Sequence, residues 1–163
     1  MKEFEIKVTA KECSYDELND IQRKLVDEAK SATFRAYAPF SGYQVGAAIL
    51  LDNGKIVSGS NQENAAYPSG LCAERTTAFY AASANPGVAF RKIAIAASPT
   101  LQNEETTVSG FQRKPVSPCG GCRQALMQYE HIYGPIEILL YGSDKIYILP
   151  SVSSLLPYSF TDF

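Results

Sequence analysis

The sequence predicts an α/β fold of three layers, in which helices cover both faces of a central mixed sheet of five strands. Two observations predict it: short apolar runs that suit buried strands, and longer segments in which apolar residues recur at helical spacing. The 163 residues, 45% of them hydrophobic, are enough for one ordinary domain with a single core. We therefore expect one domain over 1–163, in which residues 1–13 form an N-terminal extension with no role indicated by the sequence.

The first elements are predicted from alternation and from capping signals. Residues 4–8 alternate apolar and polar side chains, which favours a short strand, although a mobile or interface-forming tail fits the same pattern. Ser14 and Glu17 form a capping-box pair, so a helix is predicted to begin there. Apolar residues at helical spacing continue this helix toward Pro39.

The other elements follow from apolar runs, turn signals and helical periodicity. Asp52, Asn53 and Gly54 separate two apolar runs and predict a hairpin turn. The predicted strands cover 45–51, 55–60, 90–97, 136–141 and 145–149, and the further predicted helices cover 71–84 and 119–131. This order of elements implies a mixed sheet with helices on both faces.

Two segments lie outside these elements. Residues 100–116 are polar and long for a connection within a compact domain, so we expect a functional, mobile or surface segment there. Residues 155–160 carry two leucines together with Tyr158 and Phe160. So many apolar side chains predict a C-terminal segment that docks on the protein.

Charge and hydropathy argue against several classes of partner. The chain has 15 Lys+Arg and 17 Asp+Glu, a net charge of -2, and hence no general basic field for a nucleic acid or an acidic membrane. No stretch approaches the ~20 apolar residues that span a bilayer, and the N-terminus has no apolar signal core. We therefore expect a cytoplasmic protein that acts on a small molecule, with no nucleic acid or membrane partner. The missing signal segment also argues against pairing the four cysteines as disulfides.

Three of the cysteines form a candidate metal site. Cys72 begins one predicted helix, and Cys119 and Cys122, separated by two glycines, begin another. Three thiolates can hold Zn²⁺ and leave its fourth position open, which is typical of catalytic zinc, because the open position holds a water that the metal acidifies. A structural zinc usually takes four protein ligands, and neither Cys13 nor His131 lies at ligand spacing to supply the fourth.

Charged residues beside Cys72 complete a candidate catalytic centre. Glu74 lies two positions after this ligand at a helix start, so its carboxylate can face the open metal position without binding the metal. It can take a proton from water and deliver it to a ring nitrogen and a departing amine, as general base and acid in turn. Arg75 and Arg123 can donate hydrogen bonds to thiolate sulfur and so withdraw charge from the metal, and we favour Arg75.

Four blocks of sequence carry these residues and their neighbours, at residues 36–48, 61–67, 72–76 and 117–124. The third reads Cys-Ala-Glu-Arg-Thr and the fourth Ser-Pro-Cys-Gly-Gly-Cys-Arg-Gln. Together the blocks resemble the motifs of the cytidine deaminase family in its small, three-cysteine form, and the resemblance extends from about residue 14 to residue 160. It implies the fold of that family, with the three cysteines as zinc ligands and Glu74 as the glutamate that is not a ligand.

The resemblance also implies residues that bind a nucleoside. Asn61 and Glu63 match the pair that hydrogen-bonds the ribose hydroxyl and so selects a nucleoside over a free base. Tyr43 and Phe160 match aromatic residues that lie against the pyrimidine ring, and the resemblance implies that Phe160 does so in a neighbouring subunit. Tyr43 stands where the family commonly has phenylalanine, and Phe40 where tyrosine is common, which leaves the fine substrate preference open.

Other residues match positions at a subunit boundary or at the base. Ala65 and Tyr67 match residues that contact the nucleoside across such a boundary, and backbone groups at Ala73 match those that read the cytosine edge. The family's small form is a homotetramer with one zinc ion per subunit. The resemblance therefore implies active sites that are shared between copies of this chain.

The implied function is zinc-dependent hydrolytic deamination of cytidine and 2'-deoxycytidine to uridine and 2'-deoxyuridine, with release of ammonia, in pyrimidine salvage. Two alternatives stay open: a deaminase of another aminopyrimidine nucleoside such as blasticidin S, and a non-catalytic zinc-stabilised binding domain. A requirement for Glu74 separates the enzyme from the binding domain. Deamination of cytosine within a nucleic acid strand is disfavoured, because it needs a basic, aromatic channel for the strand.

Overall fold

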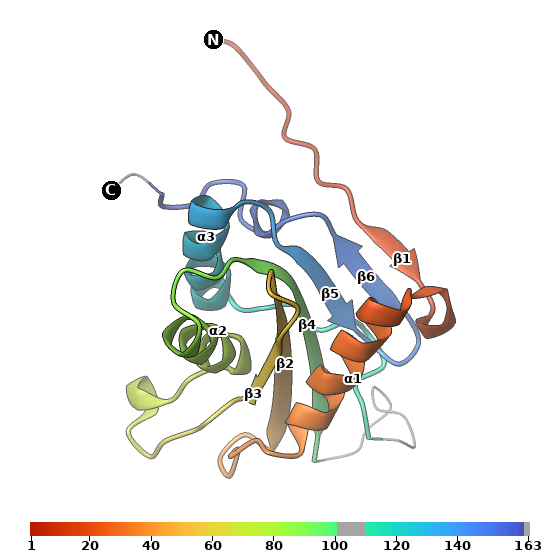
Figure 1. Ribbon diagram of the computed structural model, residues 1–163, viewed down its shortest axis with the longest axis vertical. Helices are drawn as coiled ribbons and strands as arrows, with labels where there is room; N and C mark the ends of the chain where they lie inside the picture. Colours follow the sequence, from red (N-terminus) through yellow and green to blue (C-terminus); the bar gives the residue numbers. More distant parts are fainter. Residues whose placement is uncertain (101–109, 162–163) are drawn as a thin grey trace.

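Six strands form one mixed sheet with helices on both faces in the computed structural model, which describes residues 1–100 and 110–161 (Figure 1). The strands are β1 (Lys11–Cys13), β2 (Tyr43–Leu51), β3 (Ile56–Ser60), β4 (Phe90–Pro99), β5 (Glu137–Tyr141) and β6 (Ile146–Leu149), and the helices are α1 (Asp20–Thr33), α2 (Ala73–Ala84) and α3 (Gly120–Tyr133). The strand order is β1-β6-β5-β4-β2-β3; β4 and β5 run parallel, and the other described pairs are antiparallel. The predicted three-layer α/β class is confirmed, with one strand more than expected.

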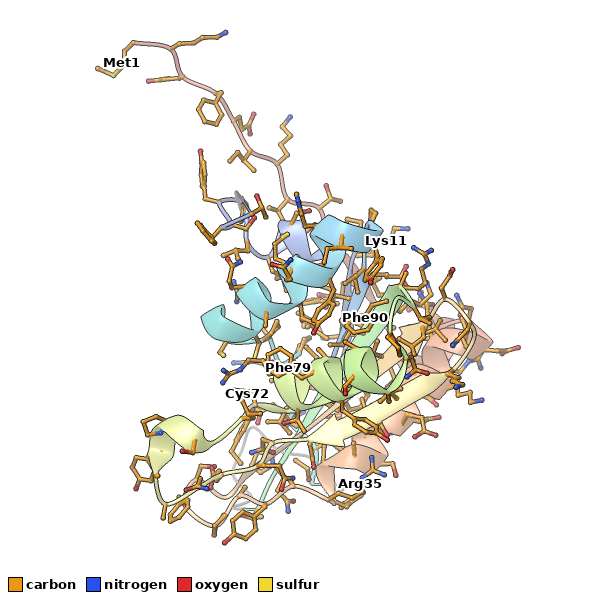
Figure 2. All side chains as sticks on the ribbon, turned by 60° about the vertical axis from the view of Figure 1, so that its left-hand side comes forward. Met1, Lys11, Arg35, Cys72, Phe79 and Phe90 are labelled. Atoms are coloured by element: carbon orange, nitrogen blue, oxygen red, sulfur yellow. The ribbon has the colours of Figure 1, made fainter. Side chains whose placement is uncertain are left out.

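The additional strand is β1, which lies later in the chain than the strand predicted at residues 4–8. Residues 1–10 form neither helix nor strand and extend away from the domain (Figures 1 and 2). β1 pairs antiparallel with β6, and beside this pairing Lys145 Nζ donates to Glu12 at 2.9 Å. Its short, polar sequence therefore becomes a strand through edge pairing and not through a pattern of its own.

The first helix starts later than its first capping signal. Ser14 does form a capping box, but it closes a short 3₁₀ turn, η1 (Tyr15–Glu17). Leu18 then takes an extended conformation and buries its side chain in the core, and a second capping box at Asn19 begins α1. The helix ends at Thr33, well before the predicted end. No helix among the described residues is long and apolar enough to cross a membrane.

The central strands send alternate side chains into two cores. Ile49 of β2 packs in the core beneath α2 and α3, whereas Ala48 packs in the core beneath α1, and β4 repeats this alternation. Small residues on the second face let α1 lie close to β2: a Cβ added to Gly46 would lie 2.7 Å from the Thr33 backbone nitrogen. The bulkier face supports α2 and α3, which pack beside each other.

The described end of the long connection belongs to the core. Residues 101–109, on which most of the expectation for 100–116 falls, lie outside the described part of the chain. Phe111 is 7% exposed and packs edge-on against Tyr141, with ring centroids 5.8 Å apart. Lys30 Nζ of α1 lies 5.3 Å from the Phe111 ring centroid, within the range of a cation–π contact. Of the three expectations for residues 100–116, a surface segment does not describe residue 111, and a functional or mobile role of the segment stays a prediction.

Candidate active site

Two helix starts bring three cysteines together. Cys72 caps α2, Cys119 caps α3, and Cys122 lies in the first turn of α3. The Cys119 Sγ lies 3.9 Å from that of Cys72 and 3.5 Å from that of Cys122. All three sulfur atoms lie within 4.8 Å of one another, and over residues 1–100 and 110–161 they are the one such group of three or more His, Cys, Asp or Glu side chains.

The distances and the donor chemistry fit a zinc ion. Sulfur atoms bound to zinc at about 2.3 Å and at tetrahedral angles lie about 3.8 Å apart. The two sulfur separations from Cys119 are close to this value. A hydrogen bond from Cys122 and the guanidinium of Arg75 lower the pKa of Cys72, which favours the thiolate that zinc binds. With three sulfur donors, a bound ion keeps one position for another ligand.

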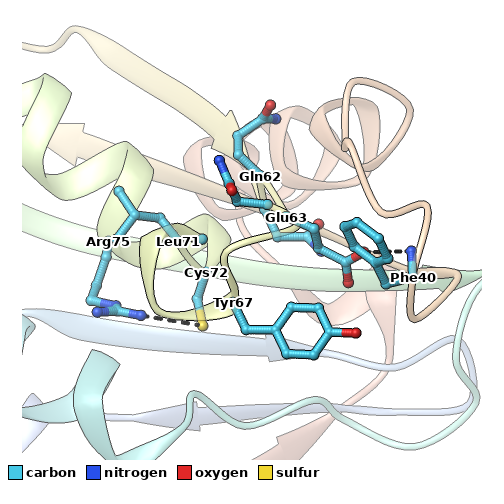
Figure 3. A pocket seen from close by; sticks show the side chains of 10 residues that line it. Phe40, Gln62, Glu63, Tyr67, Leu71, Cys72 and Arg75 are labelled. Carbon is cyan, nitrogen blue, oxygen red and sulfur yellow. Dashed lines mark hydrogen bonds between the residues drawn. The ribbon is translucent and has the colours of Figure 1, made fainter.

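The two arginines next to the cluster contact different groups. Arg75 Nη2 donates to Cys72 Sγ at 3.9 Å (Figure 3). Arg123 instead donates to oxygen atoms of the preceding segment and of the C-terminal segment: Pro118 O (2.9 Å), Ser117 Oγ (3.1 Å) and Leu155 O (2.9 Å). Of the two candidates, the structure places Arg75 against a ligand sulfur.

Glu74 is a buried carboxylate beside the thiols. It lies in the first turn of α2 and its residue is 4% exposed. Burial raises the pKa of the Glu74 carboxyl, and the charge of Cys72 adds to the rise. A carboxyl group of raised pKa can hold a proton closer to neutral pH than an exposed one, which suits a group that accepts and returns protons.

A cavity of about 330 Å³ lies next to Glu74. Tyr43, Asn61 and Ala73 line it together with Cys72 and Cys119. Its volume falls within the range of small-molecule sites. Three of the residues predicted to bind substrate therefore share one cavity with the candidate catalytic group and two of the candidate metal ligands.

A second cavity, of about 420 Å³, adjoins the first at Asn61 and Cys72. Figure 3 shows it with Glu63 and Tyr67 among its lining side chains and Arg75 on the far side of Cys72. Asn61 lines both cavities, so a ligand that extends from one into the other would pass this side chain.

Asn61 is held by the backbone at the start of β2. Its Oδ1 accepts a hydrogen bond from Val45 N at 2.8 Å, and its Nδ2 donates to Tyr43 O at 2.9 Å. An amide nitrogen carries two hydrogens, so Nδ2 has a second donor to offer to a ligand.

Glu63 is held by the loop that precedes β2. Its carboxylate accepts hydrogen bonds from Ser41 Oγ and from Phe40 N, the latter at 2.8 Å (Figure 3). These bonds, with that of Ser41 the larger cause, hold the pKa of Glu63 below its usual value. The carboxylate is therefore charged at neutral pH and can accept a hydrogen bond from a ligand hydroxyl.

The other predicted residues, Ala65, Tyr67 and Phe160, are exposed and do not line the first cavity. Ala65 is exposed, and Tyr67, at the start of the turn η2 (Tyr67–Ser69), is 73% exposed although it lines the second cavity. Phe160 is 70% exposed and lines neither cavity. Within one chain, therefore, Ala65 and Phe160 line neither of the two cavities.

Ser41 is a site residue that sequence reasoning missed. Besides donating to Glu63, its Oγ accepts a hydrogen bond from Tyr43 N at 3.0 Å, and the residue lines the first cavity. Its position within the block 36–48, between two aromatic residues, was the available signal.

Fold and site together are typical of one class of protein, the zinc hydrolases in which thiolates hold the metal and a nearby carboxylate moves protons. Comparison with known families agrees. The model of the cytidine and deoxycytidylate deaminase zinc-binding region matches residues 19–133. The chain belongs to the cytidine deaminase family, and zinc is the metal that its three-cysteine cluster is suited to hold.

Relatives and solved structures are similar over most of the chain. A cytidine deaminase of Sporosarcina psychrophila is 36% identical over 138 residues, which cover 85% of this chain and 90% of that protein. A cytidine deaminase of Halalkalibacterium halodurans is 34% identical over 148 residues, 86% of this chain and 94% of that protein. The crystal structure of cytidine deaminase from Burkholderia pseudomallei superposes with a TM-score of 0.68 at 35% identity, covering 84% of this chain and 97% of that one.

Proposed function

We propose that this chain hydrolyses cytidine and 2'-deoxycytidine to uridine and 2'-deoxyuridine and releases ammonia. The observation that carries the proposal is the placement of Glu74, a 4% exposed carboxylate that shares a cavity with Cys72 and Cys119. Membership of the family supports the choice of substrate, since the relatives described above are cytidine deaminases.

The cysteines would bind the metal, and Arg75 would offset part of the charge of their thiolates. Cys72, Cys119 and Cys122 would hold one zinc ion per subunit. When bound, the ion supplies an acidified water as the nucleophile. Arg75 donates to the Cys72 sulfur and so offsets part of the negative charge of three thiolates.

Glu74 would carry the protons. One carboxylate oxygen accepts a proton from the attacking water and delivers it to the ring nitrogen next to the carbon that is attacked. The same carboxylate then takes the proton of the added hydroxyl and gives it to the amino group, which leaves as ammonia while the carbonyl forms. One water is consumed and one ammonia is released, so Glu74 ends the cycle as it began.

The two adjoining cavities suggest how a nucleoside is held. The pyrimidine ring would occupy the first, against Tyr43 and the backbone at Ala73. The ribose would extend toward the second, where Asn61 Nδ2 and the Glu63 carboxylate are fixed by backbone donors and acceptors and can bind its hydroxyl. Binding by a hydroxyl-specific pair disfavours a free base, because these polar groups would lack the ribose hydroxyl as a partner.

The active unit would be a homotetramer. Ala65, Tyr67 and Phe160 are exposed in one chain, and in an assembly they would contact the nucleoside of a neighbouring copy. Exposed aromatic side chains on α2 support association, since Phe79 is 44% and Tyr80 64% exposed. With a free nucleoside as substrate, the enzyme would act in pyrimidine salvage in the cytoplasm.

The direct test is ammonia release from cytidine by the zinc-loaded protein beside Glu74→Gln at matched zinc content. The parent should be active, and the variant should lose roughly 10²–10⁴-fold in kcat, because the amide cannot accept the proton. Matched zinc ensures that the loss reports on proton transfer and not on the metal.

Two results would contradict the proposal in different ways. A folded, zinc-loaded parent that releases no ammonia from cytidine would remove cytidine as the substrate, and blasticidin S and other aminopyrimidine nucleosides would be tried next. Equal activity of parent and Glu74→Gln would remove the role of Glu74.

A further inference from the structure

We propose that Gln124 is a positioning residue that fixes Phe160, and through it the exposed aromatic end of the chain, on the start of α3. The inference rests on the proposed function, in which Phe160 contacts the nucleoside of a neighbouring subunit. Gln124 itself would touch neither substrate nor metal; it would act through the backbone of Phe160.

The central observation is a pair of hydrogen bonds. Gln124 Nε2 donates to Phe160 O at 2.7 Å, and Gln124 Oε1 accepts from Phe160 N at 3.1 Å. One side-chain amide thus satisfies both backbone groups of one residue, as a neighbouring strand would. Two bonds to the same residue fix its orientation as well as its distance.

The rest of the C-terminal segment is tied to the same helix. Glu130, which is 8% exposed, accepts hydrogen bonds from Val152 N at 2.7 Å and Ser153 N at 2.9 Å. Arg123 donates to Leu155 O at 2.9 Å. The ties show that the segment runs back along α3, from near the helix end at Glu130 toward its start, and Figure 1 shows the chain ending beside α3.

The hydrogen bonds between Gln124 and Phe160 place the anchor of the aromatic residue next to the candidate metal site. Gln124 lies two residues after Cys122, so one turn of α3 carries both a candidate zinc ligand and the anchor of Phe160. The Phe160 residue is 70% exposed and lines neither cavity of its own chain, which leaves it accessible to a neighbouring copy. In the proposed tetramer, Gln124 of one chain would then set how the Phe160 ring meets substrate in another.

The test compares Gln124→Leu with Gln128→Leu, the same change one turn later on α3 and outside the anchor. Gln124→Leu should raise the KM for cytidine about tenfold and change kcat by less than about twofold, since an aromatic contact with the ring is made before and during reaction. Gln128→Leu should leave both constants within about twofold of the parent. Zinc content and assembly mass are measured in each protein.

Coupling to Phe160 separates positioning from a general structural role. If Gln124 acts through Phe160, Phe160→Ala should raise KM in the parent but by less than about twofold in the Gln124→Leu background. Hydrogen exchange at the Phe160 amide, which donates to Gln124, should be faster in Gln124→Leu than in Gln128→Leu. If the leucine variant loses zinc, Gln124→Glu, which keeps the acceptor for Phe160 N, replaces it in the same cycle.

An unchanged KM in Gln124→Leu would overturn the inference, and so would effects of Gln124→Leu and Phe160→Ala that simply add. Either result leaves a parent that still deaminates cytidine, so the proposed function would stand. An inactive parent would instead contradict the proposed function, and the exchange rate of the Phe160 amide would still report on the anchor.

Discussion

At the scale of single residues, much of the site is arranged by hydrogen bonds that do not involve substrate. Ser41 joins two candidate nucleoside-binding residues, because its hydroxyl donates to Glu63 and accepts from Tyr43 N. Asn61 likewise uses its amide to hold the backbone of Tyr43 and Val45. Groups that are already held in place lose less conformational freedom when they bind a ligand. Removing such a contact should therefore weaken substrate affinity more than it lowers kcat.

Ser41→Ala tests this expectation. Without the hydroxyl, Glu63 loses one donor and Tyr43 N loses an acceptor, so the KM for cytidine should rise about three- to tenfold with a smaller change in kcat. The measurement is steady-state ammonia release. Ser58→Ala is the matched control, since Ser58 Oγ accepts from Arg35 away from the cavities. A KM that Ser41→Ala leaves unchanged would mean that Glu63 and Tyr43 are positioned without Ser41.

At the scale of elements, an ion pair joins neighbouring strands beneath α1. Glu137 of β5 lies opposite Lys92 of β4, and its Oε1 accepts from Lys92 Nζ at 2.7 Å and from Gln22 Nε2 of α1 at 3.0 Å. Burial raises the pKa of Glu137, but the two hydrogen bonds and the charges of nearby lysines together outweigh burial and leave the pKa below the ordinary 4.5. A carboxylate with a lowered folded-state pKa adds stability above its unfolded pKa, and this stability is lost as pH falls through the folded value.

Glu137→Gln should therefore lower the free energy of unfolding by about 1–2 kcal/mol at neutral pH. The difference from the parent should shrink as pH falls below the ordinary glutamate pKa, because the parent then loses its charge as well. Urea unfolding across this range measures it, and any effect of acid on the metal site is shared by both proteins. Glu12→Gln, in an exposed pair with Lys145, should lower stability less than Glu137→Gln does. A difference that grows toward low pH would contradict the assignment.

The sequence predicted elements well where local signals and tertiary packing agree. The cysteines that cap α2 and α3 and the turn before β3 are such places. Ser14 shows the limit: its capping box forms, but burial of Leu18 interrupts the helix, and Asn19 has to cap it again. β1 shows another, because its three polar residues become a strand through pairing with β6, which no local pattern reveals.

The candidate site divides in the same way. Cys72, Cys119 and Glu74 were predicted together because they lie in short motifs whose residue types indicate metal binding and proton transfer. The structure places them around one cavity. Ser41 and Gln124 were not assigned roles, since each bonds a group that lies far away in the sequence: the Glu63 carboxylate for Ser41 and the Phe160 backbone for Gln124. The hydroxyl and amide of such residues serve in many contexts, so only the folded arrangement indicates what they hold.

At the scale of the whole molecule, the exposed aromatics of α2 should lie in a subunit interface. Phe79→Asp should reduce the mass in solution from four times 17.8 kDa to smaller species, and activity should fall with it, because a charge cannot be buried there without a partner. Light scattering beside an ammonia assay measures both. Phe4→Asp, on the extended N-terminal segment, is the control and should leave the mass unchanged. A parent that is fully active as a single chain would contradict a shared site.

The close approach of α1 to β2 has a consequence for how tolerance to substitution is interpreted. A side chain at Gly46 would lie 2.7 Å from Thr33 N and 3.0 Å from Ala32 Cβ, so even alanine would force the helix off the sheet. A survey of variants scored by survival would therefore rank Gly46 with the candidate metal ligands, although its added side chain would face α1 and it has no chemistry to contribute. Intolerance of substitutions at Gly46 would reflect how closely α1 packs against β2. Assigning it to catalysis would be an error.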